Sequence, residues 1–294
     1  MATPSPSPSP RPRLAVAVGD PRGIGPEVVR KALRQPIDAD VRIVGGWEDG
    51  APSDVEAGRV AAQSIEAAAR LALSGEVDAI VTGPVNKSAL HAAGYRFPGI
   101  TEFLAHVAAD IPVAMMLTTG RLRVVLVTTH LSLRDAIASV TTERVVQAGR
   151  IARDALQQWW GITSPRLALC ALNPHAGEGG LFGDEDERVL QPAAEALDAT
   201  GPLPADTVFV RALRGEFDAV LAPYHDVGMT AVKVSGFGTG VNVTLGLPFI
   251  RTSPDHGTAF DIAGKGIADA GSMRASLELA VQLAAARQAR GRGD

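Results

Sequence analysis

The expected fold follows from the stretch LAVAVGDPRGIGPEVVRKAL, residues 14–33. Its first five residues are apolar, as in a strand buried on both faces of a sheet. A turn rich in glycine and proline follows, and Pro26 begins an amphipathic helical pattern. The same order recurs at 79–93 and 167–197, and another apolar run lies at 219–221. Strands separated by helices predict an α/β fold with a mostly parallel sheet.

Longer patterns indicate how the chain divides. Val113 to Thr118 and Arg121 to Thr128 are joined by Thr119-Gly120 and predict a β-hairpin, an antiparallel element in the sheet. A helical pattern from Thr141 to Trp160 is long enough to separate two sub-domains, and a last helix, Met273 to Gln288, is expected to return to the first. The expected units are a disordered Ser-Pro arm (1–12), a discontinuous first sub-domain (13–119 and 257–294) and a second sub-domain (120–256).

Composition narrows the class of protein. The formal net charge is −4, and acidic and basic residues are interspersed along the sequence. This distribution argues against a basic face that binds nucleic acid. Cys170 is the only cysteine, so no intrachain disulfide forms and a cytoplasmic location is expected. No segment has the roughly eighteen consecutive apolar residues of a membrane helix. We therefore expect small molecules as partners, and neither nucleic acid nor membrane.

Two glycine and proline clusters, Gly19 to Pro26 and Thr82 to Lys87, come directly after predicted strands. Ligands of open α/β sheets bind at such strand ends, and backbone N–H groups at a following helix can hold an anion. For an isolated cluster, a tight connection that binds no ligand is the preferred interpretation. The first cluster lacks the G-x-G-x-x-G order, so it does not predict a Rossmann site.

Histidines follow three predicted strands: His130, His175 and His225. Imidazoles at three strand ends can converge on one metal ion, although position alone leaves a chance trio open. Asp226 is placed to orient an imidazole or to cap a helix. The remaining histidines include two, His91 and His106, that lie in helical patterns and read as surface or packing residues.

Several longer motifs carry a resemblance to a known family. They are GDPRGIGP (19–26), TGPVNK (82–87), TEF (101–103), TTHL (128–131), LNPHAGEGG (172–180), GPLPADT (201–207), YHD (224–226) and GVN through RTS (240–253). The sequence from residue 14 nearly to its end resembles the 4-hydroxythreonine-4-phosphate dehydrogenase family of vitamin B6 (pyridoxine) biosynthesis. A further segment, DHGTAFDIAGKG (255–266), is similar to the adenosine-binding loop of isocitrate and isopropylmalate dehydrogenases, whose non-Rossmann fold the family shares.

The resemblance implies roles for individual residues. It implies a divalent metal, usually zinc, on His130, His175 and His225, with the site completed across a homodimer interface in the second sub-domain. Substrate contacts implied by the family are Thr101, Asp206, Lys233, Asn242 and Arg251. The cofactor, NAD or NADP, is expected at His256, Gly257, Thr258 and Asp261. Lys233 and Arg251 are also both expected within apolar, glycine-rich strands, where an unpaired charge is costly.

The implied reaction is metal-dependent oxidation of the secondary alcohol of 4-phosphooxy-threonine. The resulting β-keto acid loses carbon dioxide and leaves 3-amino-2-oxopropyl phosphate. Two departures keep other readings open: Ile100 stands where the family has a substrate-binding histidine, and the segment between Gly46 and Ala57 is shorter than in the family. The alternatives are a paralogous dehydrogenase for phospho-threonate, phospho-erythronate or an aromatic dihydrodiol dicarboxylate, and a non-catalytic ligand-binding relative.

Overall fold

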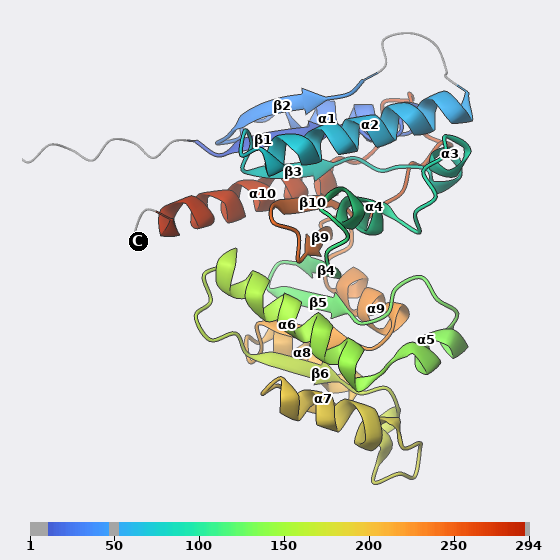
Figure 1. Ribbon diagram of the computed structural model, residues 1–294, viewed down its shortest axis with the longest axis vertical. Coiled ribbons are helices and arrows are strands. Elements are labelled where there is room, and N and C mark those ends of the chain that lie inside the picture. The colour runs from blue at the N-terminus through green and yellow to red at the C-terminus, as the bar shows by residue number, and fades with distance from the viewer. Residues whose placement is uncertain (1–10, 47–52, 292–294) are drawn as a thin grey trace, which may run out of the picture.

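The computed structural model describes residues 11–46 and 53–291. Its strands form one ten-stranded sheet in the order β2-β1-β3-β10-β9-β4-β5-β8-β6-β7 (Figure 1). The strands are β1 (Arg13–Ala17), β2 (Asp40–Val44), β3 (Ala79–Thr82), β4 (Ala114–Thr119), β5 (Leu122–Leu126), β6 (Leu167–Cys170), β7 (Thr200–Leu203), β8 (Ala219–Ala222), β9 (Val241–Leu245) and β10 (Ile250–Pro254). The helices are α1 (Gly25–Ala32), α2 (Asp54–Leu73), α3 (Lys87–Ala92), α4 (Ile100–Val107), α5 (Leu133–Ser139), α6 (Thr142–Gln158), η1 (Pro174–Gly177), η2 (Asp186–Leu190), α7 (Gln191–Ala196), α8 (Ala205–Leu213), α9 (His225–Gly236) and α10 (Gly271–Arg290).

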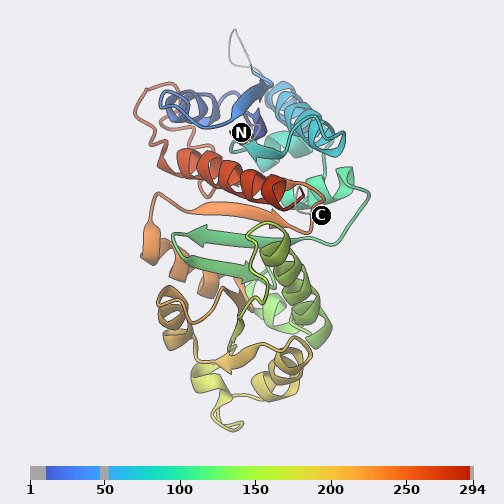
Figure 2. The ribbon, with the colours of Figure 1, turned by 90° about the vertical axis from the view of Figure 1, so that its left-hand side faces the viewer.

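The pairing of the strands confirms the expected fold class. Parallel pairs form both ends of the sheet, and the centre is antiparallel where β9 pairs with β10 and β4. The predicted hairpin is β4 and β5, with Gly120 at φ +54° in the turn. Such a left-handed conformation suits glycine, which has no Cβ to clash. The long predicted helices are α6 and α10, and α10 lies across the middle of the molecule against the central strands (Figure 2).

Alternation of side chains along the strands distributes the core over two faces. On one face a single hydrophobic cluster joins the sheet to α1, α6, α7 and α10, with Val16 and Val125 among its members. The other face carries two separate clusters: Ala15 lies in the one under α2, α3 and α4, and Val124 lies in the one under α8 and α9. A cleft lies between these two helix groups, over the central strands.

Some expectations need correction. Lys233 does not lie in a strand: the segment 225–236 forms helix α9, whose valines and glycines resemble a strand pattern locally. The predicted helix from Asp186 to Leu197 begins instead as the π-helical turn η2 and continues as α7. Of the predicted arm only Arg11 and Pro12 fall within the described residues, and residues 47–52 of the shortened segment lie outside them. No helix of the described part has the length and apolarity needed to cross a membrane.

Candidate functional site

A cleft of about 330 Å³ opens between the two helix groups, over the central strands. Its floor consists of the side chains that β4, β9 and β10 direct to this face, and its walls are the loops after β3, β5 and β8. The lining residues are Gly83, Pro84, Val85, Lys87, Gly99, Ile100, Thr101, Glu102, Met115, Leu117, His130, His225, Met229, Asn242, Arg251, Ser253, Pro254, Asp255, His256 and Gly257.

Arg251 forms the charged base of this cleft. Its side chain points to the cleft face because its neighbours on β10, Ile250 and Thr252, point to the opposite face. The residue is only 3% exposed. Its guanidinium donates hydrogen bonds to Thr82 Oγ1 (2.6 and 3.1 Å) and Thr244 Oγ1 (2.9 Å), and among the described residues no carboxylate pairs with it. Burial lowers the pKa of Arg251 to about 10. A buried, unneutralised cation beside a cleft is suited to an anionic ligand.

His130 and His225 approach each other at one end of the cleft. They follow the adjacent parallel strands β5 and β8, and their ring centroids are 5.5 Å apart. Burial, reinforced by the positive charge of Lys87, lowers the pKa of His130 below its usual value, which favours the neutral imidazole that binds metals. His225 Nδ1 lies 2.7 Å from Asp226 Oδ1, so Asp226 holds the ring, whereas Tyr224 occupies the N-cap position of α9.

His175 lies apart from this pair. It follows β6, the next strand after β8, but in a protruding loop, where its side chain is 66% exposed. Its Nδ1 lies 3.0 Å from Glu178 Oε2, and its ring packs edge-on against Phe182. In the described part of the chain no three His, Cys, Asp or Glu side chains are grouped closely enough to hold a metal. A single chain thus brings two of the three predicted ligands together.

The residues expected to bind substrate divide between two places. Thr101 and Asn242 line the cleft, where Asn242 Oδ1 is buried and has no hydrogen-bond partner among the described residues. Lys233 reaches the cleft edge from α9 and pairs with Asp255 at 3.3 Å. Asp206 is not in the cleft but lines a separate groove between α8 and α9.

The expected cofactor loop adjoins the cleft through His256 and Gly257. His256 Nε2 is buried and has no hydrogen-bond partner within residues 11–46 and 53–291, while Nδ1 lies 3.0 Å from the carbonyl oxygen of Gly257. Thr258 is used structurally: its carbonyl accepts from Ile24 N, which joins the loop to the first glycine and proline cluster. Asp261 is exposed outside the cleft.

Three charged cleft residues were not among the predicted site residues: Lys87, Glu102 and Asp255. A sequence signal existed for each of them. Lys87 ends the second glycine and proline cluster, Glu102 follows Thr101, and Asp255 precedes His256.

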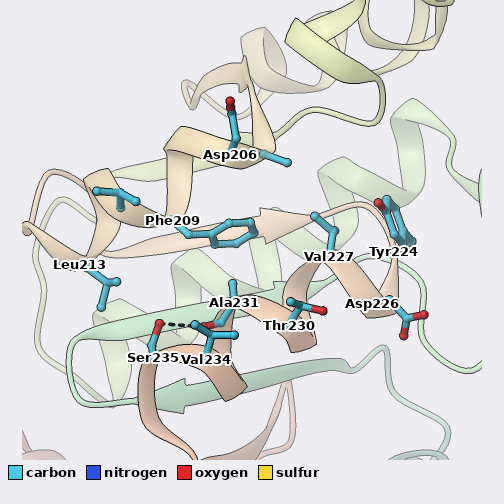
Figure 3. Close-up of a pocket in the computed structure, with 12 residues that line it drawn as sticks. Asp206, Phe209, Leu213, Tyr224, Asp226, Val227, Thr230, Ala231, Val234 and Ser235 are labelled. Atoms are coloured by element: carbon cyan, nitrogen blue, oxygen red, sulfur yellow. Dashed lines mark hydrogen bonds between the residues drawn. The ribbon is translucent and has the colours of Figure 1, made fainter.

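The groove between α8 and α9 is larger, about 590 Å³, and mostly apolar (Figure 3). Phe209, Val227 and Ala231 point into it, with Asp206 and Tyr224 at its rim. Beside it Val234 and Phe237 are 83% and 84% exposed. Apolar area of this kind commonly marks a protein–protein contact.

The fold and the cleft define the class of protein. A beta-decarboxylating dehydrogenase from Thermococcus kodakarensis has the same fold, with a TM-score of 0.54 at 18% identity over 96% of this chain and 87% of that one. The architecture is therefore that of this beta-decarboxylating dehydrogenase.

The chain belongs to the family described as pyridoxal phosphate biosynthetic protein PdxA, whose model matches residues 27–280. A 4-hydroxythreonine-4-phosphate dehydrogenase from Beijerinckia indica is 46% identical over 318 residues, 92% of this chain and 94% of that protein. A D-threonate 4-phosphate dehydrogenase from Salmonella typhimurium is 41% identical over 322 residues, covering 92% and 98%. The crystal structure of a 4-hydroxythreonine-4-phosphate dehydrogenase from Klebsiella pneumoniae gives a TM-score of 0.83 at 40% identity, covering 93% and 99%. The protein is thus an oxidoreductase, a dehydrogenase of this family.

Proposed function

We propose that this dehydrogenase oxidises the secondary alcohol of 4-phosphooxy-threonine with NAD or NADP, and that the β-keto acid formed decarboxylates to 3-amino-2-oxopropyl phosphate. The observation that carries the proposal is Arg251, a buried cation that forms no ion pair among the described residues, in a cleft that also holds a histidine pair. The cation suits an acid and the histidines suit metal-assisted alcohol chemistry. The single, buried cysteine supports a cytoplasmic location.

Two imidazoles of one chain, His130 and His225, are suited to hold a divalent metal, zinc in our proposal. Their rings are close, the pKa of His130 is lowered mainly by burial, and Asp226 orients His225. When bound, the metal would supply Lewis-acid polarisation of the substrate hydroxyl. The chain's own contribution is to position the substrate. Arg251 binds the carboxylate of the substrate, and Asn242 Oδ1 accepts a hydrogen bond from a donor group of the substrate.

A second copy of the chain is proposed to supply the third ligand, His175. The exposed loop that carries His175 also exposes Leu181 and Phe182, and the apolar α8–α9 groove offers a surface for a partner. A homodimer with a two-fold axis would bury both features in each copy.

Nicotinamide cofactor binding is proposed for the loop at 256–261. Support comes from His256 Nε2, a buried nitrogen without a partner that an adenosine group can satisfy. When bound there, the oxidised cofactor would supply the acceptor for the hydride of the carbinol carbon, so that alcohol oxidation and cofactor reduction balance.

A second candidate substrate, D-threonate 4-phosphate, is favoured by one feature of the cleft wall. Ile100 lines the cleft where the family resemblance implies a histidine, so substrate recognition differs there. The Salmonella relative named for that substrate is 41% identical. Both substrates are phosphorylated hydroxy acids and require the same alcohol chemistry.

The deciding experiment measures NADH or NADPH formation from both acids, together with zinc content per subunit. Subunit mixing then tests the shared site. Inactive His130→Ala and His175→Ala dimers, dissociated and reassembled together, should recover roughly a quarter of wild-type activity, because each mixed dimer has one intact site. The control mixture, His130→Ala with His225→Ala, should stay inactive because both ligands come from one chain. Turnover unaffected by removing the metal would refute the mechanism.

A further inference from the structure

We propose that two residues of α1, Glu27 and Lys31, are positioning residues for the nicotinamide cofactor. They hold the β10–α10 loop (residues 255–270) in the conformation that receives it. This inference rests on the proposed function, because that proposal assigns the cofactor to residues 256–261 of the loop. It gives a role to two side chains outside the lining of the cleft.

The β10–α10 loop has little regular structure of its own. Between the end of β10 and the start of α10 the described backbone forms neither helix nor strand. Its internal backbone hydrogen bonds close short turns, from Ile262 N to Ala259 O (3.1 Å) and from Lys265 N to Ile262 O (3.2 Å). An unrestrained loop loses conformational entropy when it closes on a ligand. Contacts that fix the loop beforehand therefore increase its affinity for that ligand.

Glu27 and Lys31 supply such contacts at the far end of the loop. The Glu27 carboxylate accepts hydrogen bonds from Gly266 N (3.2 Å) and Ala268 N (2.8 Å). Lys31 Nζ donates to the carbonyl oxygens of the same two loop residues, at 2.9 and 2.7 Å. The two side chains also pair with each other at 2.8 Å across one turn of α1. Because a charged group takes part in each of these bonds, they fix the loop more firmly than neutral hydrogen bonds would.

The turn that precedes α1 holds the loop at a second place. Ile24 N donates to the carbonyl oxygen of Thr258 at 2.9 Å. The Arg22 guanidinium lies over the ring of Phe260, 5.3 Å from its centroid. Both attachments come from one segment, residues 22–31, so the loop has a single rigid support along its length.

The packing of α10 is secured by other bonds. Arg274 of α10 donates to carbonyl oxygens at the end of α1 and just after it, among them that of Pro36 at 2.9 Å. Ser272 Oγ donates to the carbonyl oxygen of Gly240 at 2.6 Å and fixes the start of α10 beside β9. The ion pair on α1 therefore acts on the loop itself rather than on the helix that follows it.

The same loop presents an unsatisfied group at the cleft. His256 and Gly257 line the cleft, and His256 Nε2 is buried and has no hydrogen-bond partner in the described part of the chain. A ligand satisfies such a nitrogen best when the loop holds it in one place. The ion pair should therefore affect the affinity for the cofactor and leave the chemical step unchanged.

The test compares Glu27→Gln and Lys31→Met with wild type. The Kd of NAD, NADP and AMP, measured by calorimetry without substrate, should rise about 5- to 50-fold in each variant, because charge-assisted hydrogen bonds to the loop are lost. KM for the cofactor should rise similarly, whereas kcat and KM for the acid at saturating cofactor should change less than about threefold. Lys31→Arg should keep most of the affinity. Glu66→Gln is the matched control, since Glu66 pairs with Arg70 at the same spacing on α2 of the same sub-domain.

Hydrogen exchange gives a second readout that depends on neither cofactor nor turnover. Amides of residues 257–270 should exchange faster in both variants, those of Gly266 and Ala268 above all in Glu27→Gln, while the rest of the chain matches the control. An unchanged Kd in both variants, or exchange that rises equally throughout the chain, would overturn the positioning role. If wild type binds NAD but oxidises none of the acids, the proposed substrate fails and the Kd comparison still decides the role of the pair. If wild type binds neither NAD nor NADP, the cofactor assignment and this inference both fail.

Discussion

Replacing Arg251 with methionine should abolish substrate binding with little loss of folding stability. Burial lowers the pKa of Arg251 to about 10, well below its usual value. At about 1.4 kcal/mol per pH unit, this lowering corresponds to roughly 3 kcal/mol against the charged form in the folded protein. This penalty is present below about pH 10 and disappears as the pH rises toward the unfolded value. Methionine removes the charge and nearly fills the volume of the arginine side chain. Loss of this penalty should therefore increase the free energy of unfolding.

An opposing cost comes from the two threonines that Arg251 bonds. Thr82 and Thr244 are both fully buried; the hydroxyl of Thr82 loses two accepted hydrogen bonds, and that of Thr244 loses one. An unsatisfied buried polar group costs about 1 to 3 kcal/mol, and the lower end applies because each hydroxyl can still donate. The two effects nearly cancel, so the net change should stay within about 2 kcal/mol, or roughly 3 °C in the unfolding midpoint.

Activity should behave differently from stability. In Arg251→Met the substrate carboxylate loses the guanidinium that binds it at the bottom of the cleft, so kcat/KM should fall at least about 100-fold. Arg251→Lys keeps the charge but lacks the planar fork, and should retain intermediate activity. Initial rates and thermal unfolding with and without substrate provide the two readouts: substrate should raise the midpoint of wild type and leave that of Arg251→Met unchanged. A variant with kcat/KM within threefold of wild type would refute the assignment of Arg251 to substrate.

Three further perturbations test other parts of the structure. Ile100→His should raise kcat/KM for a phosphorylated acid about 5- to 100-fold by restoring a hydrogen-bond donor to the cleft wall; unchanged kinetics would show that position 100 does not face substrate. Burial acts to raise the pKa of Asp218, but hydrogen bonds from Arg166 outweigh it and the pKa is lowered. Its stabilising effect is present above about pH 4 and is lost as the pH falls through the lowered pKa, so Asp218→Asn should cost about 1 kcal/mol at pH 7 in urea unfolding and nothing near pH 2. Gly58→Ala should cost about 1 to 3 kcal/mol because the added Cβ meets the carbonyl of Ala89; an unchanged urea midpoint would contradict this close approach of α2 and α3.

Local patterns in the sequence were sufficient to identify the fold class and several functional positions. The apolar run at 14–18, the hairpin around Gly120 and the helix from Thr141 each depend on residues near one another in the chain, so their periodicity is readable without the fold. Histidines directly after strands were likewise recognisable, because a strand end in an α/β sheet is a common place for ligand-binding residues. The roles of individual residues came from longer motifs and their resemblance to a family.

Tertiary structure decided which of these positions meet. The sequence contains nothing that orders β5, β8 and β6 side by side, and this order brings His130 to His225 while the loop after β6 carries His175 outward. It also contains two valines beside Lys233 that favour a strand locally, whereas packing on β5 and β4 makes this segment the helix α9. Arg251 was expected in a strand, but only the sheet as assembled gives it two threonine partners, from β3 and β9, and no carboxylate. The reason is physical: periodicity specifies the face that a side chain takes, and the neighbours on that face are set by contacts between segments distant in the chain.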